Sequence, residues 1–449
     1  MAQLMAQPIT TDAALHADHQ ALLGRMFEVA LDSVSAELCL PAHLPPPASG
    51  RRLVLGIGKA GAAMVKVAMR DARPNTEAII LTRYGHSVDP TSMPPGVAVF
   101  EAGHPLPDER GVEAARHIVD AVSRLGEGDE LLALISGGGS ALLSLPVDGV
   151  SLAETQSLTR ELLLCGASIS QINCVRKHLS QVKGGRLAVM ARPAKVMTLA
   201  FSDIPGDDPA LIASGPTIAD RTKLADARRV LNLYGIVASD NVRAALENPA
   251  NEAPLPSSPA LAGSTVKVVA HGGMALQAAG ALAAAAGYKP VYLGHDLEGD
   301  ATELGTVHAA LALHHAHLGG RWALLSGGET TVQVNNPKGR GGRNTEYLLS
   351  LAFALNGAKG ISAIACDTDG IDGTEDNAGA TIDPSTLARA KRLGLCPIDA
   401  LHSNMTYDLF DRLGDLIMTG PTRTNVNDFR VILVDNAVGA DILKPRFLQ

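Results

Sequence analysis

A short loop in the second half of the chain places three cationic side chains among glycines. Residues 336–346 read NPKGRGGRNTE, so Lys338, Arg340 and Arg343 come just before an expected helix that starts near Asn344. The planar fork of arginine matches the paired oxygens of a carboxylate or phosphate, and cations directed at a transferring phosphoryl group are the main catalytic device of kinases. The loop therefore predicts an anion site suited to phosphoryl transfer.

A glycine-rich turn in the first half carries a lysine. Residues 56–61 read GIGKAG, between an expected strand and an expected helix, and Lys59 lies inside the turn beside backbone N–H groups that can hold phosphate. The turn also matches G-x-G-x-x-G, the fingerprint of dinucleotide binding. The acid expected after the next strand is missing, but Arg83 stands there and could accept a 2′-phosphate. Phosphate binding by Lys59 and a nicotinamide site both remain open.

A second turn, SGGGS, runs from Ser136 to Ser140. Glycine has no Cβ and tolerates positive φ, so the backbone amides of Gly137, Gly138 and Gly139 can approach an anion closely. A tight strand-to-helix turn alone would need fewer glycines. We therefore expect an anion-binding turn here, and a similar strand end, ALLSGG at 323–328, recurs in the second half.

Two acidic loops follow apolar runs. SDIPGDD at 202–208 contains Asp203 and Asp207, and DTDGIDG at 367–373 contains Asp367 and Asp369. Magnesium binds typically through one or two carboxylates plus substrate phosphates, so these four acids are predicted to hold a metal or transfer a proton. The second loop lacks the glycine and glutamate positions of a calcium-binding EF-hand.

A basic helix is expected over residues 171–183. Its apolar residues recur at three- and four-residue steps and leave Lys177 among the polar positions, just before a glycine pair. Lys177 could face an anion or simply be solvated. Two capping-box spacings, Ser151 with Glu154 and Ser168 with Gln171, mark the starts of this helix and of the preceding one.

Apolar strand-like runs alternate with helical stretches along the chain, which is typical of βαβ units around mainly parallel sheets. Residues 247–264 are rich in Pro, Ala and Ser and are the best linker candidate. We therefore predict an α/β fold with an N-terminal domain at 1–255 and a C-terminal region at 262–449. Because ligands bind at the carboxyl ends of parallel strands, the polar turns above should lie at that edge.

Composition excludes several classes of function. The 449 residues are 46% hydrophobic, enough for one to three domains, and a net charge of −8 with 3% aromatic residues argues against nucleic-acid binding. No apolar run is long enough to span a membrane and the first residues do not read as a leader, so a cytoplasmic location is expected. Five scattered cysteines suggest neither disulfides nor a zinc site.

Taken in order, eight motifs resemble those of the class II glycerate 2-kinases, also called the MOFRL family, whose members often carry the label hydroxypyruvate reductase of tartrate degradation. The resemblance covers roughly residues 20–430. The motifs are GIGKAG, GHPLPDERG, SGGGSALL, INCVRKHLSQVKGGRLA, SDIPGDDPALIASGPT, SGGETTV, GRGGRNTE and DTDGIDGTEDNAG.

The resemblance implies a Rossmann-like N-terminal domain and a smaller α/β MOFRL domain at about 320–430. It implies phosphorylation of the C2 hydroxyl of D-glycerate by ATP and Mg²⁺ in an interdomain cleft, with Lys59 and Arg343 as the catalytic pair. Gly58, Glu329, Arg340 and Asn344 are then expected in the pocket, without fixed roles. The family loop GGRNQE has Thr345 here in place of glutamine.

Two other functions stay open from the sequence. One is an NADH- or NADPH-dependent hydroxypyruvate reductase, which would use the G-x-G-x-x-G turn. The other is a sensor of sugar acids without turnover, against which stands the intact pair of Lys59 and Arg343. The expected partners are D-glycerate and ATP, with no nucleic acid and no membrane; a homodimer is compatible with the sequence, which does not fix the oligomeric state.

Overall fold

The computed structural model describes residues 12–88, 93–94 and 96–436, and these residues form two compact units. We call residues 35–271 together with 423–426 the parallel-sheet unit. Residues 12–34, 272–422 and 427–436 form the mixed-sheet unit.

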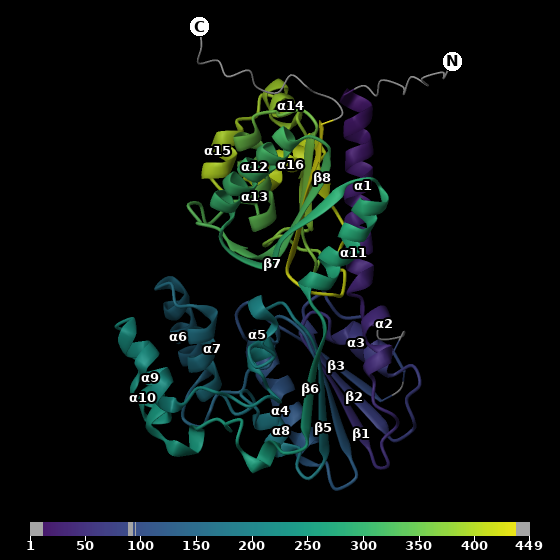
Figure 1. Cartoon of the computed structure of the whole chain (residues 1–449). Helices are drawn as coiled ribbons and strands as arrows, with labels where there is room; N and C mark the ends of the chain where they lie inside the picture. Colours follow the sequence, from purple (N-terminus) through teal and green to yellow (C-terminus); the bar gives the residue numbers. More distant parts are fainter. Residues whose placement is uncertain (1–11, 89–92, 95, 437–449) are drawn as a thin grey trace, which may run out of the picture. The chain divides into compact units, whose positions relative to one another are not determined.

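The parallel-sheet unit is built on six parallel strands in the order β3-β2-β1-β4-β5-β6, several of which lie side by side in Figure 1. This is the doubly wound order, in which the chain moves outward from β1 in one direction and from β4 in the other. The crevice beyond the carboxyl ends of β1 and β4 is the usual ligand position in such sheets. The strands are β1 (Arg52–Ile57), β2 (Thr76–Arg83), β3 (Val97–Ala102), β4 (Glu130–Ile135), β5 (Lys195–Phe201) and β6 (Ser264–Ala270).

Helices cover both faces of this sheet because side chains alternate along each strand. Leu53, Leu55 and Ile57 of β1 point into a core shared with α4, whereas the intervening Gly56 faces α3, where a Cβ would lie 2.4 Å from the Val65 side chain. The helices of this unit are α2 (Ala36–Cys39), α3 (Gly61–Ala68), α4 (Glu109–Ser123), α5 (Gly139–Leu142), α6 (Leu152–Leu164), α7 (Ile169–His178), α8 (Arg186–Met190), α9 (Leu224–Leu233) and α10 (Asp240–Glu247).

The helices α6, α7, α9 and α10 pack around a separate apolar cluster. Both predicted capping boxes are present: Ser151 and Glu154 cap α6, and Ser168 and Gln171 cap α7. The local sequence signals for these two helix starts are thereby confirmed.

The mixed-sheet unit has strand order β11-β10-β9-β12-β8-β7, in which only β7 and β8 pair in parallel. A mainly parallel sheet was expected throughout, and the alternation of strands and helices could not reveal that β9 to β12 run antiparallel to their neighbours. The strands are β7 (Lys289–Asp300), β8 (Arg321–Thr331), β9 (Ile361–Asp367), β10 (Gly379–Ile382), β11 (Leu416–Ile417) and β12 (Asp428–Asp435).

The first helix of the chain belongs to the mixed-sheet unit. It packs on α11 and on the sheet, with the rings of Phe27 and Phe429 5.5 Å apart. The helices of this unit are α1 (Asp12–Ser33), α11 (Gly272–Ala285), α12 (Ala301–Leu318), α13 (Arg343–Leu355), α14 (Thr386–Arg392), α15 (Pro397–His402) and α16 (Thr406–Leu413). None of the helices in the described part of the chain has the length and apolar character needed to cross a membrane.

The chain passes between the units at places that differ from the expected boundary. Strand β6 pairs with β5, so the first unit continues past the linker-like segment at 247–264 and ends at His271. Residues 423–426 return to the parallel-sheet unit late in the sequence. Strand pairing, and not linker composition, decides these limits. The predicted fold class, a two-part α/β protein with a Rossmann-like N-terminal sheet, is confirmed.

Candidate functional site

The two predicted glycine turns of the first half meet at the point where the strand order reverses. Ser136, fully buried after β4, donates from its backbone N–H to the carbonyl oxygen of Ile57 at 2.8 Å, and its hydroxyl accepts from the Ala60 N–H at 3.0 Å. The Lys59 N–H donates to the carbonyl oxygen of Gly137 at 3.0 Å. Ser136, expected to contact an anion, therefore joins the two turns instead.

The glycines of these turns hold conformations and approaches that a side chain would prevent. Gly58 has φ +110°, and a Cβ there would lie 2.4 Å from the Ser136 carbonyl oxygen. Gly138 has φ +81°, and its α-carbon is covered by the Lys59 side chain and the His104 ring, which a Cβ would meet at 3.4 and 3.2 Å. Among the described residues, the N–H groups of Gly137, Gly138 and Gly139 find no acceptor. Three free amides beside a lysine are suited to bind an anion.

Asp203 lies against the same turn. It follows β5, and its Oδ2 accepts a hydrogen bond of 2.9 Å from Nδ2 of Asn425. A Cβ on Gly137 would lie 1.7 Å from this oxygen and 2.2 Å from the Asn425 nitrogen. The structure thus brings Asp203 next to the SGGGS turn, as the predicted strand edge requires. Asn425 was missed, because it comes from a segment 222 residues away that the sequence did not single out.

Replacement of Gly137 by alanine is expected to lower the free energy of unfolding by about 1–3 kcal/mol, because overpacking forces its neighbours to shift. Urea denaturation would measure this change. Gly126→Ala is the matched control in the same unit, since its Cβ would meet nothing closer than 3.9 Å. Equal stability of the two variants would contradict the close packing of Gly137 against Asp203.

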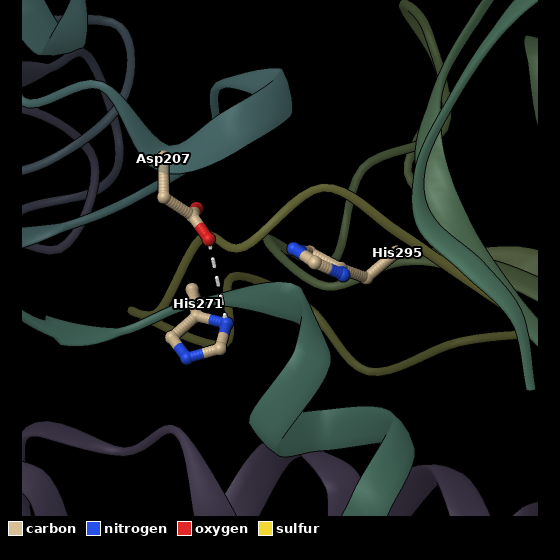
Figure 2. A group of neighbouring side chains, drawn as sticks. All are labelled: Asp207, His271 and His295. Atoms are coloured by element: carbon tan, nitrogen blue, oxygen red, sulfur yellow. Dashed lines mark ion pairs between the residues drawn. The ribbon is translucent and has the colours of Figure 1, made fainter.

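Asp207, the second predicted acid of this loop, faces an imidazole. Its Oδ2 lies 3.6 Å from Nδ1 of His271. A dashed line marks this ion pair in Figure 2. His271 follows β6 directly, so both residues stand after neighbouring strands of one parallel sheet. Carboxylate oxygens suit Mg²⁺, and imidazole nitrogen suits transition metals better. His271 was missed, although its place directly after an apolar strand was a usable signal.

Ser140 uses its hydroxyl within the protein. Its Oγ lies 2.7 Å from Oγ of Ser214, which donates to Oδ1 of Asn173 at 2.9 Å. This chain of contacts connects the turn after β4 to α7. The Ser140 hydroxyl, which was expected to contact an anion, instead makes a hydrogen bond that supports the turn.

Lys177 is paired with an acid inside the protein. Its side chain is buried, and Nζ lies 3.3 Å from Oδ1 of Asp220. Asp220 also accepts from the backbone N–H and the hydroxyl of Thr222. The Lys177–Asp220 pair therefore holds α7 against the segment that contains Asp220. The anion-binding role suggested by the position of Lys177 on its helix is not supported by this contact.

In the mixed-sheet unit, Arg343 gathers three carboxylates. It is the first residue of α13, and it donates to Asp428 at 2.8 Å, Glu329 at 2.8 Å and Asp367 at 2.7 Å. Burial lowers the pKa of Arg343, but these carboxylates outweigh it and raise that pKa well above its usual value. The guanidinium is therefore permanently charged and uses three of its five N–H donors, which leaves two for a ligand.

The structure thus brings together Arg343, Glu329 and Asp367, all three predicted from the sequence. Asp428, at the start of β12, was not predicted; the sequence shows only an acid before an apolar run. Asp369 lies close to Asp367, whose Oδ1 accepts from the Asp369 N–H at 2.9 Å, and both acids are buried. Asp367 therefore accepts the Asp369 N–H with Oδ1 and the Arg343 guanidinium with Oδ2.

Asn344 and Thr345 fix the start of α13. The buried carboxylate of Asp372 accepts from both of their backbone N–H groups at 3.0 Å, which is a cap for the helix N-terminus. The Asn344 side chain donates to Asp428 at 2.8 Å. Thr345, the departure from the family loop, bonds through Oγ1 to Asp372 and to Thr406. The Thr345 hydroxyl thus helps to fix the N-terminus of α13, where Arg343 lies.

Arg340 is anchored on the protein surface. It pairs with Glu375 at 2.6 Å and Asp408 at 2.8 Å, and its guanidinium carbon lies 4.4 Å from the centre of the Tyr407 ring. These contacts use three of the five N–H donors of Arg340, and two remain, as in Arg343. The observed contacts favour a role in holding the glycine-rich loop.

Glu346 makes the stability of this unit depend on pH. Its side chain is buried, Oε1 accepts from Nδ2 of Asn404 at 2.7 Å, and burial, with smaller effects of Asp300 and Asp372, raises its pKa to about 7. Between its usual value of 4.5 and about 7, the folded chain keeps a proton that the unfolded chain releases. The stabilisation present below pH 4.5 is therefore lost as the pH rises through 7.

Glu346→Gln is expected to remove this loss, so that the variant is more stable than the parent at pH 8, by about 3 kcal/mol at most, and equal to it near pH 4. Urea unfolding at the two pH values measures the difference. Glu298→Gln, at an exposed position, is the control. An unchanged pH dependence in Glu346→Gln would contradict the assignment.

Comparison with known proteins places this fold and these residues in a family. Residues 22–247 match the model described as "Domain of unknown function (DUF4147)", and residues 322–428 match the MOFRL family. The D-glycerate 2-kinase of Thermotoga maritima is 38% identical over 93% of this chain and 99% of its own. The glycerate 2-kinase of Pyrococcus horikoshii is 34% identical over 87% and 89%.

Solved structures agree. The crystal structure of the Thermotoga maritima glycerate kinase matches with a TM-score of 0.82 at 37% identity, covering 93% of this chain and all of that one. A chain from Agrobacterium vitis, provisionally named a hydroxypyruvate reductase, is 48% identical over 92% of this chain and 94% of its own. These likenesses define a two-part α/β enzyme of the sugar-acid kinase class. The chain belongs to the glycerate 2-kinase family that contains the MOFRL domain, as the motifs predicted.

Proposed function

We propose that this protein is a D-glycerate 2-kinase, which transfers the γ-phosphoryl group of ATP to the C2 hydroxyl of D-glycerate and forms 2-phosphoglycerate and ADP. The observation that carries the proposal is the Lys59 side chain lying over a turn with three free amides, at the switch point of a doubly wound sheet. Relatives named glycerate 2-kinase along nearly the whole chain support the choice of substrate.

In this reaction the hydroxyl oxygen of glycerate bonds to the γ-phosphorus, the bond from that phosphorus to ADP breaks, and the hydroxyl proton passes to a carboxylate. Lys59 and the amides of Gly137 to Gly139 neutralise and position the transferring phosphoryl group. Arg343 has two donors left and takes a second anionic group. That both cations act in one interdomain cleft stays a prediction.

Mg²⁺ fits the donor set of the loop after β5, because Asp203 and Asp207 offer hard carboxylate oxygens from two positions of one short loop. Bound there with ATP, the ion would neutralise charge on the phosphates. Asp367 and Asp369 are less suited, since Asp367 already serves Arg343 and the Asp369 carboxylate accepts the Ile371 N–H.

A hydroxypyruvate reductase is the second candidate, favoured by the names of the Agrobacterium vitis relatives and by the G-x-G-x-x-G turn. Two of its glycines have another explanation, since a Cβ on Gly56 would meet Val65 and Gly61 where α3 packs on β1. The position at the end of β2 where a dinucleotide-binding acid is expected is taken by Arg83, followed by Tyr84. A reductase also has no need of the Arg343 cluster.

One experiment separates the candidates. Purified protein is given D-glycerate, Mg²⁺ and ATP while ADP is measured, and the product is passed to enolase, which accepts 2-phosphoglycerate and not 3-phosphoglycerate. In parallel, it is given hydroxypyruvate with NADH or NADPH. We expect ADP release that needs glycerate, an enolase-positive product and no nicotinamide oxidation. Nicotinamide oxidation without ADP release would replace the kinase by the reductase, and binding without turnover would indicate a sensor.

Removing Mg²⁺ with EDTA is expected to abolish ADP release, because charge on the transferring phosphates is then uncompensated. Activity that returns on adding Mg²⁺ but not Na⁺ would support the metal requirement; full activity in EDTA would contradict it. The cytoplasmic location and a homodimeric state stay predictions.

A further inference from the structure

A small cavity in the parallel-sheet unit is lined by two cations. It lies between α7 and the segments that follow β4, and it holds about 30 Å³, room for roughly two waters or one small anion. Its polar lining includes Ser140, Thr155, Thr159, Arg176, Ser180 and Lys183, and no carboxylate lines it. The reaction proposed above does not use it.

The two cations of the cavity have fewer polar partners than the cationic residues near them in the chain. Lys177 is paired with Asp220, and Arg186 donates to the carbonyl oxygens of Lys177, Lys183 and Asn251. In contrast, Arg176 has no hydrogen bond or ion pair within the described ranges, and Lys183 donates from Nζ to the carbonyl oxygen of Leu143 alone. The cavity therefore contains positive charge without a counterion.

The mutual effect of these groups shows that the charge is costly. Burial and, to a smaller extent, the charge of Arg176 lower the pKa of Lys183 to about 7, and burial lowers the pKa of Arg176 to about 10. Two neighbouring cations, Lys183 buried and Arg176 half-buried, with no acid in the cavity lining, favour an anion between them.

We propose that this cavity binds a small oxyanion, a carboxylate or a phosphate group, between Arg176 and Lys183. For a phosphate, the guanidinium fork can meet two oxygens, the ammonium a third, and the hydroxyls of Ser180 and Thr159 can donate to the remainder; for a carboxylate, the fork and the ammonium can share its two oxygens. The small volume and the apolar side chains of Leu158 and Leu162 in the lining limit the ligand to a few atoms. A whole nucleotide does not fit.

The inference does not rest on the proposed function. If the protein is a glycerate kinase, its reaction offers two sources of such a group, the carboxylate of the acceptor acid and a phosphate. Ser140 connects the cavity to the turn that bears Gly138, because it lines the cavity and follows that turn in the chain.

The test is equilibrium binding by calorimetry, with sodium D-glycerate and inorganic phosphate as separate probes and no nucleotide present. We expect at least one probe to occupy one site per chain besides the catalytic site, and at least a tenfold loss of affinity for that site in Arg176→Gln and in Lys183→Met. Arg160→Gln is the matched control, since Arg160 lies on α6 between lining residues but is itself exposed. Its affinity should equal that of the parent.

Each outcome decides the matter. Weaker binding of glycerate in the two variants identifies a carboxylate site, and weaker binding of phosphate a phosphate site. No binding of either probe by the parent protein, or equal binding by the parent and both variants, overturns the proposal. Arg176→Lys, which keeps the charge but not the fork, guards against misfolding and should bind with intermediate affinity. Lys59→Met should retain the site, so failure here is distinct from failure of the kinase assignment.

Discussion

Arg343→Ala is expected to lower kcat for glycerate phosphorylation by about a hundredfold, the order of magnitude for loss of one preorganised charge contact. The reason is that Arg343 is held rigidly by Asp428, Asp367 and Glu329 and keeps two donors for an anion. ADP release at saturating glycerate and ATP measures the effect. Arg412→Ala is the matched control, because this exposed arginine lies on α16 in the same unit.

The same variant should also be less stable, because removal of Arg343 leaves three carboxylates without their common cation. Breaking a buried pair in this way costs about 3–5 kcal/mol, and partial exposure of Glu329 makes the lower part of that range more suitable. Arg343→Lys separates the two effects, since it keeps the charge and loses the fork. A folded Arg343→Ala protein with near-normal kcat would remove Arg343 from the catalytic machinery.

Lys59→Met is expected to lower kcat by a similar factor of about a hundred with little change in stability. Its side chain lies beside Gly138 and is only partly buried, so methionine keeps the aliphatic stem and removes the charge alone. Lys195→Met is the control. Lys195 is exposed at the start of β5, at the amino-terminal ends of the strands, whereas Lys59 follows the carboxyl end of β1.

The division between kcat and KM shows what Lys59 does. If it acts on the transferring phosphoryl group, kcat falls and the KM for ATP changes little, whereas a purely binding role raises that KM at constant kcat. Turnover within twofold of the parent would refute the assignment of Lys59. In a double variant, an effect well below the product of the two single effects would indicate that Lys59 and Arg343 serve the same step.

Much of the site could be predicted because local sequence specifies local geometry. A turn after an apolar strand must lie at the carboxyl edge of a parallel sheet, so Lys59, Gly138 and Asp203 were found from their places in the chain alone. Capping boxes at Ser151 and Ser168 are equally local. The residues that were missed, His271, Asn425 and Asp428, are ordinary in their own segments.

Helix α7 shows the limit most clearly. Its sequence offers Arg176, Lys177 and, just beyond, Lys183, and periodicity predicts only that they are polar positions. Lys177 is neutralised because Asp220, 43 residues further along, folds beside it, whereas no acid reaches Arg176 in the described structure. Which cation is free for a ligand depends on the position of distant acids.

The sequence by itself determined the α/β class, the family and the glycine turns, because these follow from periodicity, from backbone freedom and from motifs in a fixed order. The tertiary structure decided which charges are paired and where each unit ends. Asp428 reaches Arg343 across 85 residues and Asn425 reaches Asp203 across 222. Such pairings arise from strand order and packing of the whole chain, and a side chain carries no local mark of the partner it will meet.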